Sequence, residues 1–285
     1  MTQSVTNKSR VIAIANQKGG VGKTTTAVNL SASLATAERR TLLIDADPQG
    51  NSTSGVGIQR EQLELSLYDV LLDGRSLAET RRTSIHLPLL DVIPATQDLV
   101  GAEVELVGRP GREQNLRRAL ADVRDDYSFV IVDCPPSLGL LTLNVLTAAD
   151  AVIIPIQCEY YALEGLSQLL NTIKLVQRNF NPSLAIDGVL LTMYDARLNL
   201  CKQVATEAKE YFGARMFAVT VPRNVRLAEA PSFGKPIILY DVQSVGARSY
   251  LAVAQELIRR VERAEPSEPL PALPPNALSL PEVPA

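Results

Sequence analysis

Short aliphatic runs alternate with helical patterns along most of this chain, and this alternation limits its possible folds more than any other feature. Runs of this kind are typical of strands covered on both faces, as in a parallel sheet. The helical patterns between them supply the crossovers that parallel strands need. We therefore predict an α/β fold with a doubly wound, mostly parallel sheet and helices on both faces. The predicted strands are residues 11–15, 41–44, 91–93, 129–132, 151–156, 188–193 and 216–221, and the clearest predicted helices are residues 24–37, 113–124, 163–178, 201–212 and 245–261.

The composition fits a folded chain with one large domain or two ordinary ones. Of its 285 residues 46% are hydrophobic, and its net charge is only −3. These values exclude a wholly disordered chain and a polycation of the histone kind. The C-terminal end differs, because residues 261–285 hold seven of the 18 prolines and no aromatic residue. We predict a short flexible N-terminus at residues 1–9, one domain at residues 10–260 and a disordered tail at residues 261–285.

Cysteine and histidine usage narrows the chemistry. Cys134, Cys158 and Cys201 contain no CxxC pair, which excludes a zinc knuckle and a disulfide scaffold and fits a reducing compartment. His86 is the single histidine, so mechanisms that need several imidazoles are excluded. No apolar leader precedes the first predicted strand, and no apolar run reaches the roughly 18 residues of a membrane span. We expect a cytoplasmic protein that does not enter a membrane.

The strongest sequence signal is a glycine-rich loop at residues 16–26, NQKGGVGKTTT. It follows a predicted strand and opens a predicted helix, which is the context of a phosphate-binding P-loop. The glycines let backbone N–H groups turn toward phosphate oxygens. Lys23 is expected to reach the β- and γ-phosphates, and the Thr24 hydroxyl is expected to ligate Mg²⁺. The predicted nucleotide-binding residues in the loop are Lys18, Gly19, Gly20, Val21, Gly22, Lys23, Thr24 and Thr25.

Acidic residues stand at the ends of two predicted strands. Asp45 and Asp47 follow the strand at residues 41–44, and Asp133 completes a Walker B pattern, FVIVD. The carboxyl ends of parallel strands form the edge at which open α/β sheets bind ligands. An aspartate at such a place is often only a turn or helix cap, but two such signals beside a phosphate loop favour a metal site. The predicted metal-binding residues are Thr24, Asp45 and Asp133.

The loop departs from the general P-loop pattern, in which the first glycine of GxxxxGK[ST] would be residue 17. Gln17 and Lys18 stand there instead, and a second lysine at the mouth of the loop would repel Lys23 unless phosphates lie between them. This KGGxGKT arrangement resembles the deviant Walker A loop of the ParA/MinD family of P-loop ATPases. Further segments are similar to the chromosome-partitioning ParA (Soj-type) branch, so the resemblance covers nearly the whole predicted domain. They are residues 45–55, 91–101, 133–141, 157–170 and 221–240.

The resemblance implies ATP and Mg²⁺ as cofactors, a weak intrinsic ATPase activity and an ATP-bound homodimer. In this family the signature lysine crosses the dimer interface, so Lys18 is expected to contact the partner subunit's nucleotide, much as an arginine finger does. Asp47 is expected to orient the attacking water, Asp133 to support the metal and Asp45 to lie in the metal's surroundings. The expected catalytic residues are therefore Lys18, Lys23 and Asp47.

The same resemblance assigns residues near the C-terminal end of the domain. Pro222 and Asn224 match a segment that lies near the adenine, although they could equally end a strand and cap the next turn. Arg197 and Arg226 match arginines implicated in sequence-independent binding of double-stranded DNA by the ATP dimer. Each could instead be an ordinary solvated residue. Residues 195–263 contain 11 Lys/Arg and 7 Asp/Glu, a local excess of +4.

By resemblance, the expected function is an ATP-driven switch for chromosome or plasmid partitioning, associated with the nucleoid and released from DNA when a ParB-like centromere-binding protein stimulates hydrolysis. A ParA relative that positions another cargo remains an alternative. A MinD-like membrane ATPase is disfavoured, because residues 262–285 are acidic and proline-rich rather than a basic amphipathic helix. An iron-protein-type reductase needs two suitably placed cysteines per subunit, and only Cys134 is suggestive.

Overall fold

The computed structural model describes residues 9–159 and 164–263. Most of the predicted N-terminal segment, residues 1–8, therefore lies outside the described residues. The predicted tail lies outside them from residue 264 onward. Within the two described ranges, none of the helices is both long and apolar enough to span a lipid bilayer.

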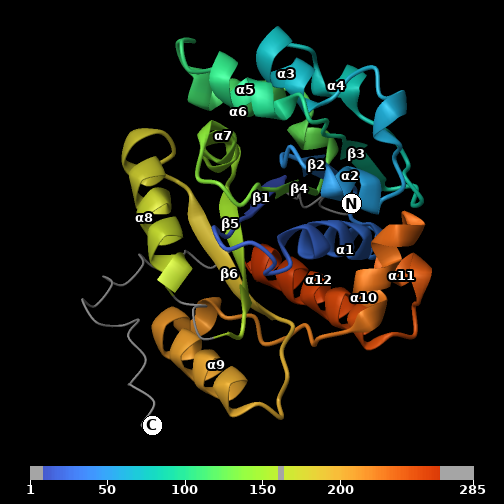
Figure 1. Cartoon of the computed structure of the whole chain (residues 1–285), viewed down its shortest axis with the longest axis vertical. Coiled ribbons are helices and arrows are strands. Elements are labelled where there is room, and N and C mark those ends of the chain that lie inside the picture. The colour runs from blue at the N-terminus through green and yellow to red at the C-terminus, as the bar shows by residue number, and fades with distance from the viewer. Residues whose placement is uncertain (1–8, 160–163, 264–285) are drawn as a thin grey trace, which may run out of the picture.

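The described residues form one six-stranded sheet in the order β3–β2–β4–β1–β5–β6 (Figure 1). All of its neighbouring strand pairs are parallel, which confirms the predicted parallel sheet. The strands are β1 (Arg10–Ile14), β2 (Thr41–Asp45), β3 (Leu90–Ile93), β4 (Phe129–Asp133), β5 (Ala151–Gln157) and β6 (Ala185–Thr192).

Helices cover both faces of this sheet, as predicted. Figure 1 shows α1 and α12 side by side on one face, α7 and α8 on the other, and α9 beyond β6. Four of the five helices predicted from the sequence, now α1, α8, α9 and α12, have limits close to those expected. The α-helices are α1 (Lys23–Thr36), α2 (Asn51–Gly55), α3 (Leu67–Asp73), α4 (Leu77–Thr80), α5 (Leu99–Glu105), α6 (Asn115–Leu120), α7 (Leu140–Ala148), α8 (Glu164–Asn179), α9 (Asn199–Phe212), α10 (Val225–Glu229), α11 (Ile237–Tyr240) and α12 (Val245–Arg263).

Alternate side chains of each strand enter two separate cores. In β1, Val11 lies in the core that contains α7 and α8, whereas Ile12 and its neighbours on that face lie in the core that contains α1 and α12. Because both faces are buried, the strand appears in the sequence as a continuous apolar run. In the second core the hydroxyls of Thr26 and Tyr250, 3.1 Å apart, join α1 to α12.

The predicted strand at residues 216–221 is wrong. This segment runs beside β6, but it pairs with its neighbours only at isolated bridges. The Glu256 carboxylate on α12 accepts hydrogen bonds from the backbone N–H groups of Ala218 and Val219, at 3.0 and 3.2 Å. Because these donors are used by a side chain, they cannot take part in a continuous strand ladder.

The predicted helix at residues 113–124 is also shorter than expected. Only α6 is α-helical, and 3-10 turns at Arg112–Gln114 and Arg124–Asp126 flank it. The backbone N–H of Leu116 donates to the Asn144 side chain on α7, at 3.3 Å, rather than to a carbonyl one turn earlier. A tertiary contact therefore replaces the hydrogen bond that would have extended the helix toward its N-terminus.

Candidate functional site

The phosphate loop lies where the order of the sheet reverses. β4 and β2 stand on one side of β1, and β5 and β6 stand on the other. At such a reversal the carboxyl ends of the strands open onto a crevice, which is where doubly wound sheets bind ligands. The loop leaves β1 at this edge and enters α1.

Two glycines give the loop a backbone that other residues rarely adopt. Gly20 and Gly22 have φ angles of 74° and 83°. Gly22 is also the N-cap of α1, and its cap carries no side-chain hydrogen bond. The N–H groups of the first helical turn are therefore available to an anion, and the helix dipole favours negative charge there. Gly19 is exposed at the tip of the loop, Val21 is buried, and Thr24 and Thr25 are half-buried in that first turn.

Neighbouring strands hold the loop in place through residues that sequence analysis did not identify. The Thr192 hydroxyl at the end of β6 donates to the Val21 carbonyl oxygen at 2.8 Å. The Asn16 side-chain amide donates to the Pro155 carbonyl oxygen at 2.7 Å, which ties the start of the loop to β5. No sequence signal pointed to Thr192, because its role depends on how β6 is placed in the sheet.

Lys23 is a buried cation at the centre of the loop. Its side chain is 7% exposed, and its ammonium donates to the Lys18 carbonyl oxygen at 3.1 Å. Burial lowers the pKa of Lys23, while the nearby negative charges of Asp133 and Asp47 oppose that change. A buried ammonium beside free backbone N–H groups is suited to bind the oxygens of a phosphate.

Lys18 is held by its own subunit in this structure. Its ammonium forms an ion pair with Glu159, just after β5, at 2.9 Å. Its backbone N–H donates to the Asn16 side chain at 3.0 Å, which fixes the turn into the loop. Sequence analysis missed Glu159 as a partner. Because the pair is partly exposed, an exchange of Lys18 to another anion would cost little.

The two strand-end carboxylates of the prediction meet, because β4 lies directly beside β2. Asp45 and Asp133 are register partners in the sheet, and neither is exposed. Asp45 is occupied by protein donors: its Oδ2 accepts from the Thr53 backbone and hydroxyl at 2.8 and 2.7 Å, and its Oδ1 accepts from the Asp47 N–H at 3.2 Å. Asp45 therefore positions the loop that carries Asp47.

Asp133 retains one unused oxygen. The Ser52 hydroxyl donates to its Oδ2 at 2.8 Å, whereas its buried Oδ1 has no hydrogen-bond partner among the described residues. Burial raises the pKa of Asp133, and the charge of Asp45 raises it further, while the hydroxyls of Ser52 and Thr24 act against this shift. An unpartnered carboxylate oxygen near a threonine hydroxyl is a donor set that suits Mg²⁺. Asp133 and Thr24 therefore fit the predicted metal site.

Asp133→Asn should stabilise the protein when nucleotide and Mg²⁺ are absent. The amide keeps an acceptor for Ser52 but removes a buried negative charge next to Asp45, so we expect a gain of about 1–3 kcal/mol in the free energy of unfolding. Urea unfolding measures this gain. With ADP present, added Mg²⁺ should stabilise the wild type more than the variant. A variant that is less stable without ligand, or that responds fully to Mg²⁺, would contradict the assignment.

Asp47 is buried on the loop between β2 and α2, with 7% exposure. Its Oδ1 accepts from the Gln49 N–H at 3.0 Å. The Arg60 guanidinium donates to the Gln49 carbonyl oxygen at 2.6 Å, so the same loop is fixed from outside. The structure thus brings Asp47, Asp133 and Lys23 together at one edge of the sheet, as sequence analysis expected.

The predicted adenine contacts lie on a separate segment that reaches the end of β6. Pro222 forms an isolated parallel bridge with Tyr194. Asn224 is the N-cap of α10, and its side-chain oxygen accepts from the Arg226 N–H at 2.8 Å. The capping alternative for Asn224 is therefore what this structure contains, and its adenine contact stays a prediction.

The two predicted DNA-binding arginines extend from adjacent segments. The Tyr194 N–H donates to the Val221 carbonyl oxygen at 3.0 Å, which brings the segment that leads to Arg197 beside the segment that leads to α10 and Arg226. Sequence analysis missed Arg223 between them. It is exposed and makes no hydrogen bond or ion pair with the described residues.

Both predicted arginines form ion pairs with carboxylates of this chain. Arg197 is 88% exposed and pairs with Asp195 at 2.6 Å, and this guanidinium lowers the pKa of Asp195 to about 2. Arg226 pairs with Glu229 at 2.9 Å and with Asp241 at 3.5 Å. The carboxylates of these pairs are already counted among the seven acidic residues of this region, so the local excess of +4 comes from the other basic residues.

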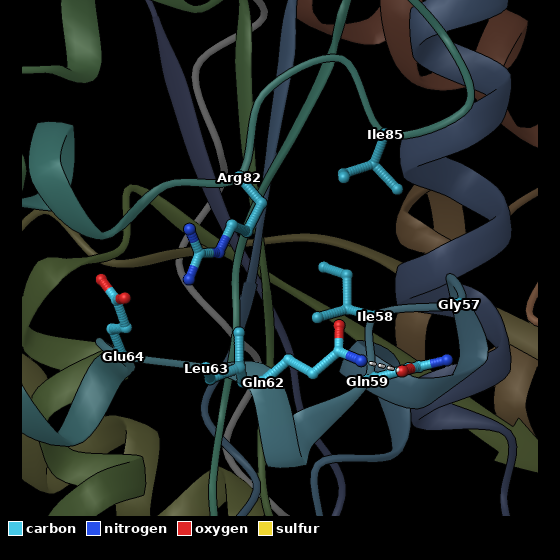
Figure 2. A pocket seen from close by; sticks show the side chains of 8 residues that line it. All are labelled: Gly57, Ile58, Gln59, Gln62, Leu63, Glu64, Arg82 and Ile85. Carbon is cyan, nitrogen blue, oxygen red and sulfur yellow. Dashed lines mark hydrogen bonds between the residues drawn. The ribbon is translucent and has the colours of Figure 1, made fainter.

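A cavity of about 630 Å³ lies away from the phosphate loop, close to the β3 edge of the sheet (Figure 2). Ile58 and Ile85 line it together with Arg82 and Glu64, and the side-chain amide of Gln62 bonds to Gln59 at its base. It contains neither the glycine loop nor a strand-end carboxylate. The nucleotide chemistry therefore belongs to the crevice at β1 and not to this cavity.

Comparison with known proteins adds to this geometry. A family described as an AAA domain matches residues 9–186. The chromosome partitioning protein ParA of Myxococcus xanthus is 59% identical over 251 residues, which cover 88% of each chain. The sporulation initiation inhibitor protein Soj of Bacillus subtilis is 58% identical over 248 residues, covering 87% of this chain and 98% of the relative.

A solved structure gives the same fold. Cobyrinic acid a,c-diamide synthase from Mycobacterium smegmatis, described with bound ADP and magnesium, has a TM-score of 0.79 and 39% identity over 90% of this chain and 97% of its own. The same protein has also been described with a bound ATP analogue and magnesium. These ligands match the donor set found here at the loop and at Asp133.

Proposed function

The chain belongs to the ParA/Soj family of P-loop ATPases, and on that basis we propose that it is an ATP-dependent dimeric switch for chromosome or plasmid partitioning. The observation that carries this proposal is the sequence identity of 58–59%, over 87–88% of this chain, to proteins named ParA and Soj. The buried, cation-centred loop at β1 supports it independently. ATP and Mg²⁺ are its cofactors.

The residues around the loop suggest how ATP is held. Lys23 and the N–H groups of the first turn of α1 bind the β- and γ-phosphate oxygens. Thr24 and Asp133 hold Mg²⁺, which supplies neutralising charge to the phosphates. Asp45 positions the adjoining loop by accepting hydrogen bonds from Thr53 and Asp47. Pro222 and Asn224 border the base.

For hydrolysis, Asp47 orients the attacking water toward the γ-phosphate. The Asp47 backbone N–H is held by the Asp45 carboxylate, and the Asp47 carboxylate is held by the backbone N–H of Gln49. The geometry needed for attack is therefore built into the loop before the substrate arrives. In the dimer, Lys18 leaves Glu159 and contacts the partner subunit's nucleotide, where it stabilises charge on the transferred phosphoryl group.

DNA binding is assigned to the adjacent segments that carry Arg197 and Arg226, together with Arg223, which precedes α10. Contacts from these guanidinium groups to phosphates carry no sequence information and are sensitive to salt. The paired carboxylates lower the affinity for DNA, because phosphate has to displace them from the guanidinium groups. We propose that the ATP dimer associates with the nucleoid in the cytoplasm, and that a ParB-like protein stimulates hydrolysis and releases it.

Other cargo positioned by the same switch remains the second candidate. The relatives named for partitioning favour chromosomal or plasmid DNA over it. An iron-protein-type reductase finds less support, because Cys134 is fully buried within a hydrophobic core and is not exposed for a cluster shared between subunits.

Arg197→Glu and Arg226→Glu should each weaken DNA binding while ATP-driven dimerisation is kept. The loss should be equal for two unrelated duplexes, and the slope of log affinity against log salt should fall by about one unit per contact in each subunit. Fluorescence anisotropy with ATP over a salt series measures both quantities. Unchanged affinity in both variants would mean that DNA binds to another surface of the protein.

Asp195→Asn is the matched control for this test. It removes the anion that competes for Arg197 and leaves the guanidinium in place. DNA should therefore bind more tightly than to the wild type, in the opposite direction from Arg197→Glu. Weaker binding by the Asp195 variant would show that the turn acts through its structure and not through the charge of Arg197.

A further inference from the structure

Two of the three cysteines meet in the fold although they are far apart in the sequence. Cys158 follows β5 directly, and Cys201 lies in the first turns of α9. The Cys201 thiol donates to the Cys158 carbonyl oxygen at 3.6 Å, so the Cys201 sulfur lies against the backbone of Cys158. Both side chains are buried and reduced. Neither has a role in the nucleotide or DNA sites described above.

The surroundings of this pair allow access by a small local opening. Residues 196–200, which precede Cys201, are all exposed, and Leu198, the N-cap residue of α9, provides no side-chain hydrogen bond to the helix. An uncapped first turn frays at lower cost than a capped one. At the other cysteine, just after β5, the side chain of Glu159 next to Cys158 is 49% exposed. Each sulfur is therefore only one residue from exposed chain.

We infer that Cys158 and Cys201 are a modification site that closes to an intramolecular disulfide in the presence of a small-molecule disulfide such as oxidised glutathione. One cysteine thiolate attacks the oxidant, forms a mixed disulfide and releases one small thiol. The second cysteine then attacks that mixed disulfide and releases the other. The two cysteines together lose two electrons and two protons, and the oxidant is reduced to two thiols.

The acidity of the Cys158 thiol affects the rate of this exchange. Burial raises the pKa of the Cys158 thiol to about 12, so its thiolate is scarce near neutral pH. Because the thiolate is the nucleophile, closure should be slow at neutral pH and faster in mildly alkaline buffer. The site would then respond to sustained oxidation and not to brief exposure.

The bond would connect two segments with separate tasks. The end of β5 carries Glu159, which pairs with Lys18. The turn that carries Arg197 leads directly into Cys201. A covalent link between them restricts the fraying of α9 and, in the unfolded chain, closes a long loop, so it should raise thermal stability. The inference itself does not depend on the proposed ATPase or DNA-binding function.

The test is a thiol count on the intact protein. Native wild type is incubated with oxidised glutathione at mildly alkaline pH, freed of the oxidant, denatured without reductant so that its buried thiols are exposed, and then alkylated and counted. Free thiols should fall from three to one, the protein should stay monomeric on a non-reducing gel, and peptides with Cys158 and Cys201 should be recovered cross-linked. The melting temperature should rise and return to its starting value after reduction.

Cys201→Ser is the matched control, because it keeps the size of the side chain and leaves Cys158 and Cys134 in place. It should form no cross-linked peptide and show no rise in melting temperature, because Cys158 can then only remain a thiol or stop at the mixed disulfide with glutathione. Wild type that keeps three thiols under these conditions, a bond that includes Cys134, or bonds between molecules would each overturn the inference. If the serine variant does not fold, the peptide map of the wild type decides the question alone.

Discussion

Lys23→Ala is expected to remove ATP binding at concentrations that saturate the wild type. Lys23 is the buried cation of the loop, and its ammonium is placed beside the free N–H groups of α1. Removal of one partner of a buried charged contact costs about 2–5 kcal/mol, or roughly 30-fold to several-thousand-fold in Kd. Isothermal titration with Mg²⁺ and ATP measures the loss. The fold should persist, because the alanine leaves the Gly22 cap and the sheet intact.

Lys18→Ala provides the matched comparison in the same loop with the same change of charge. Lys18 is half-exposed and pairs with Glu159, outside the buried part of the loop. The variant should bind ATP almost as tightly as the wild type but fail to dimerise or hydrolyse it. Sedimentation velocity with ATP checks the dimer. A normal ATP dimer from this variant would contradict the role of Lys18 across the interface, and equal loss of ATP binding in both variants would remove the distinction between the lysines.

Asp47→Ala should retain ATP and Mg²⁺ but lose about 10²–10⁴-fold in the rate of hydrolysis, which is the usual contribution of a group that positions or activates water. Neither Lys23 nor Thr24 is altered by the change. The protein should therefore accumulate as an ATP dimer that stays on DNA, and a partner should no longer release it. Single-turnover hydrolysis and the dissociation rate from immobilised DNA measure the two effects.

Asp47→Asn separates chemistry from loop structure. The asparagine oxygen can still accept from the Gln49 N–H, so the turn between β2 and α2 is preserved. Its amide lacks the charge that orients water, so hydrolysis should fall as it does in the alanine variant. Hydrolysis at the wild-type rate in the asparagine variant, with loss in the alanine variant, would mean that Asp47 serves only to shape the loop.

Much of the fold followed from local patterns. Strands buried on both faces must be apolar throughout, so β1, β2 and β4 could be predicted from their composition alone. The failures lie where a distant residue takes over a backbone group. Glu256 is on α12, far in sequence from residues 218 and 219, and its hydrogen bonds prevent a strand that β-branched residues would otherwise favour. Asn144 takes the Leu116 N–H at the N-terminal end of α6 in the same way.

The same distinction between local and distant residues applies to the candidate site. The glycine loop, Lys23 and the aspartates at strand ends could be predicted without the fold, because each depends on residues that are adjacent in the chain. The tertiary structure was needed to place β4 between β1 and β2, which pairs Asp45 with Asp133 and leaves one Asp133 oxygen without a partner among the described residues. It also decided that Thr192 holds Val21, that Glu159 holds Lys18 and that Cys158 meets Cys201. These contacts join residues distant in sequence, and strand order and register, which no local pattern encodes, set their separation.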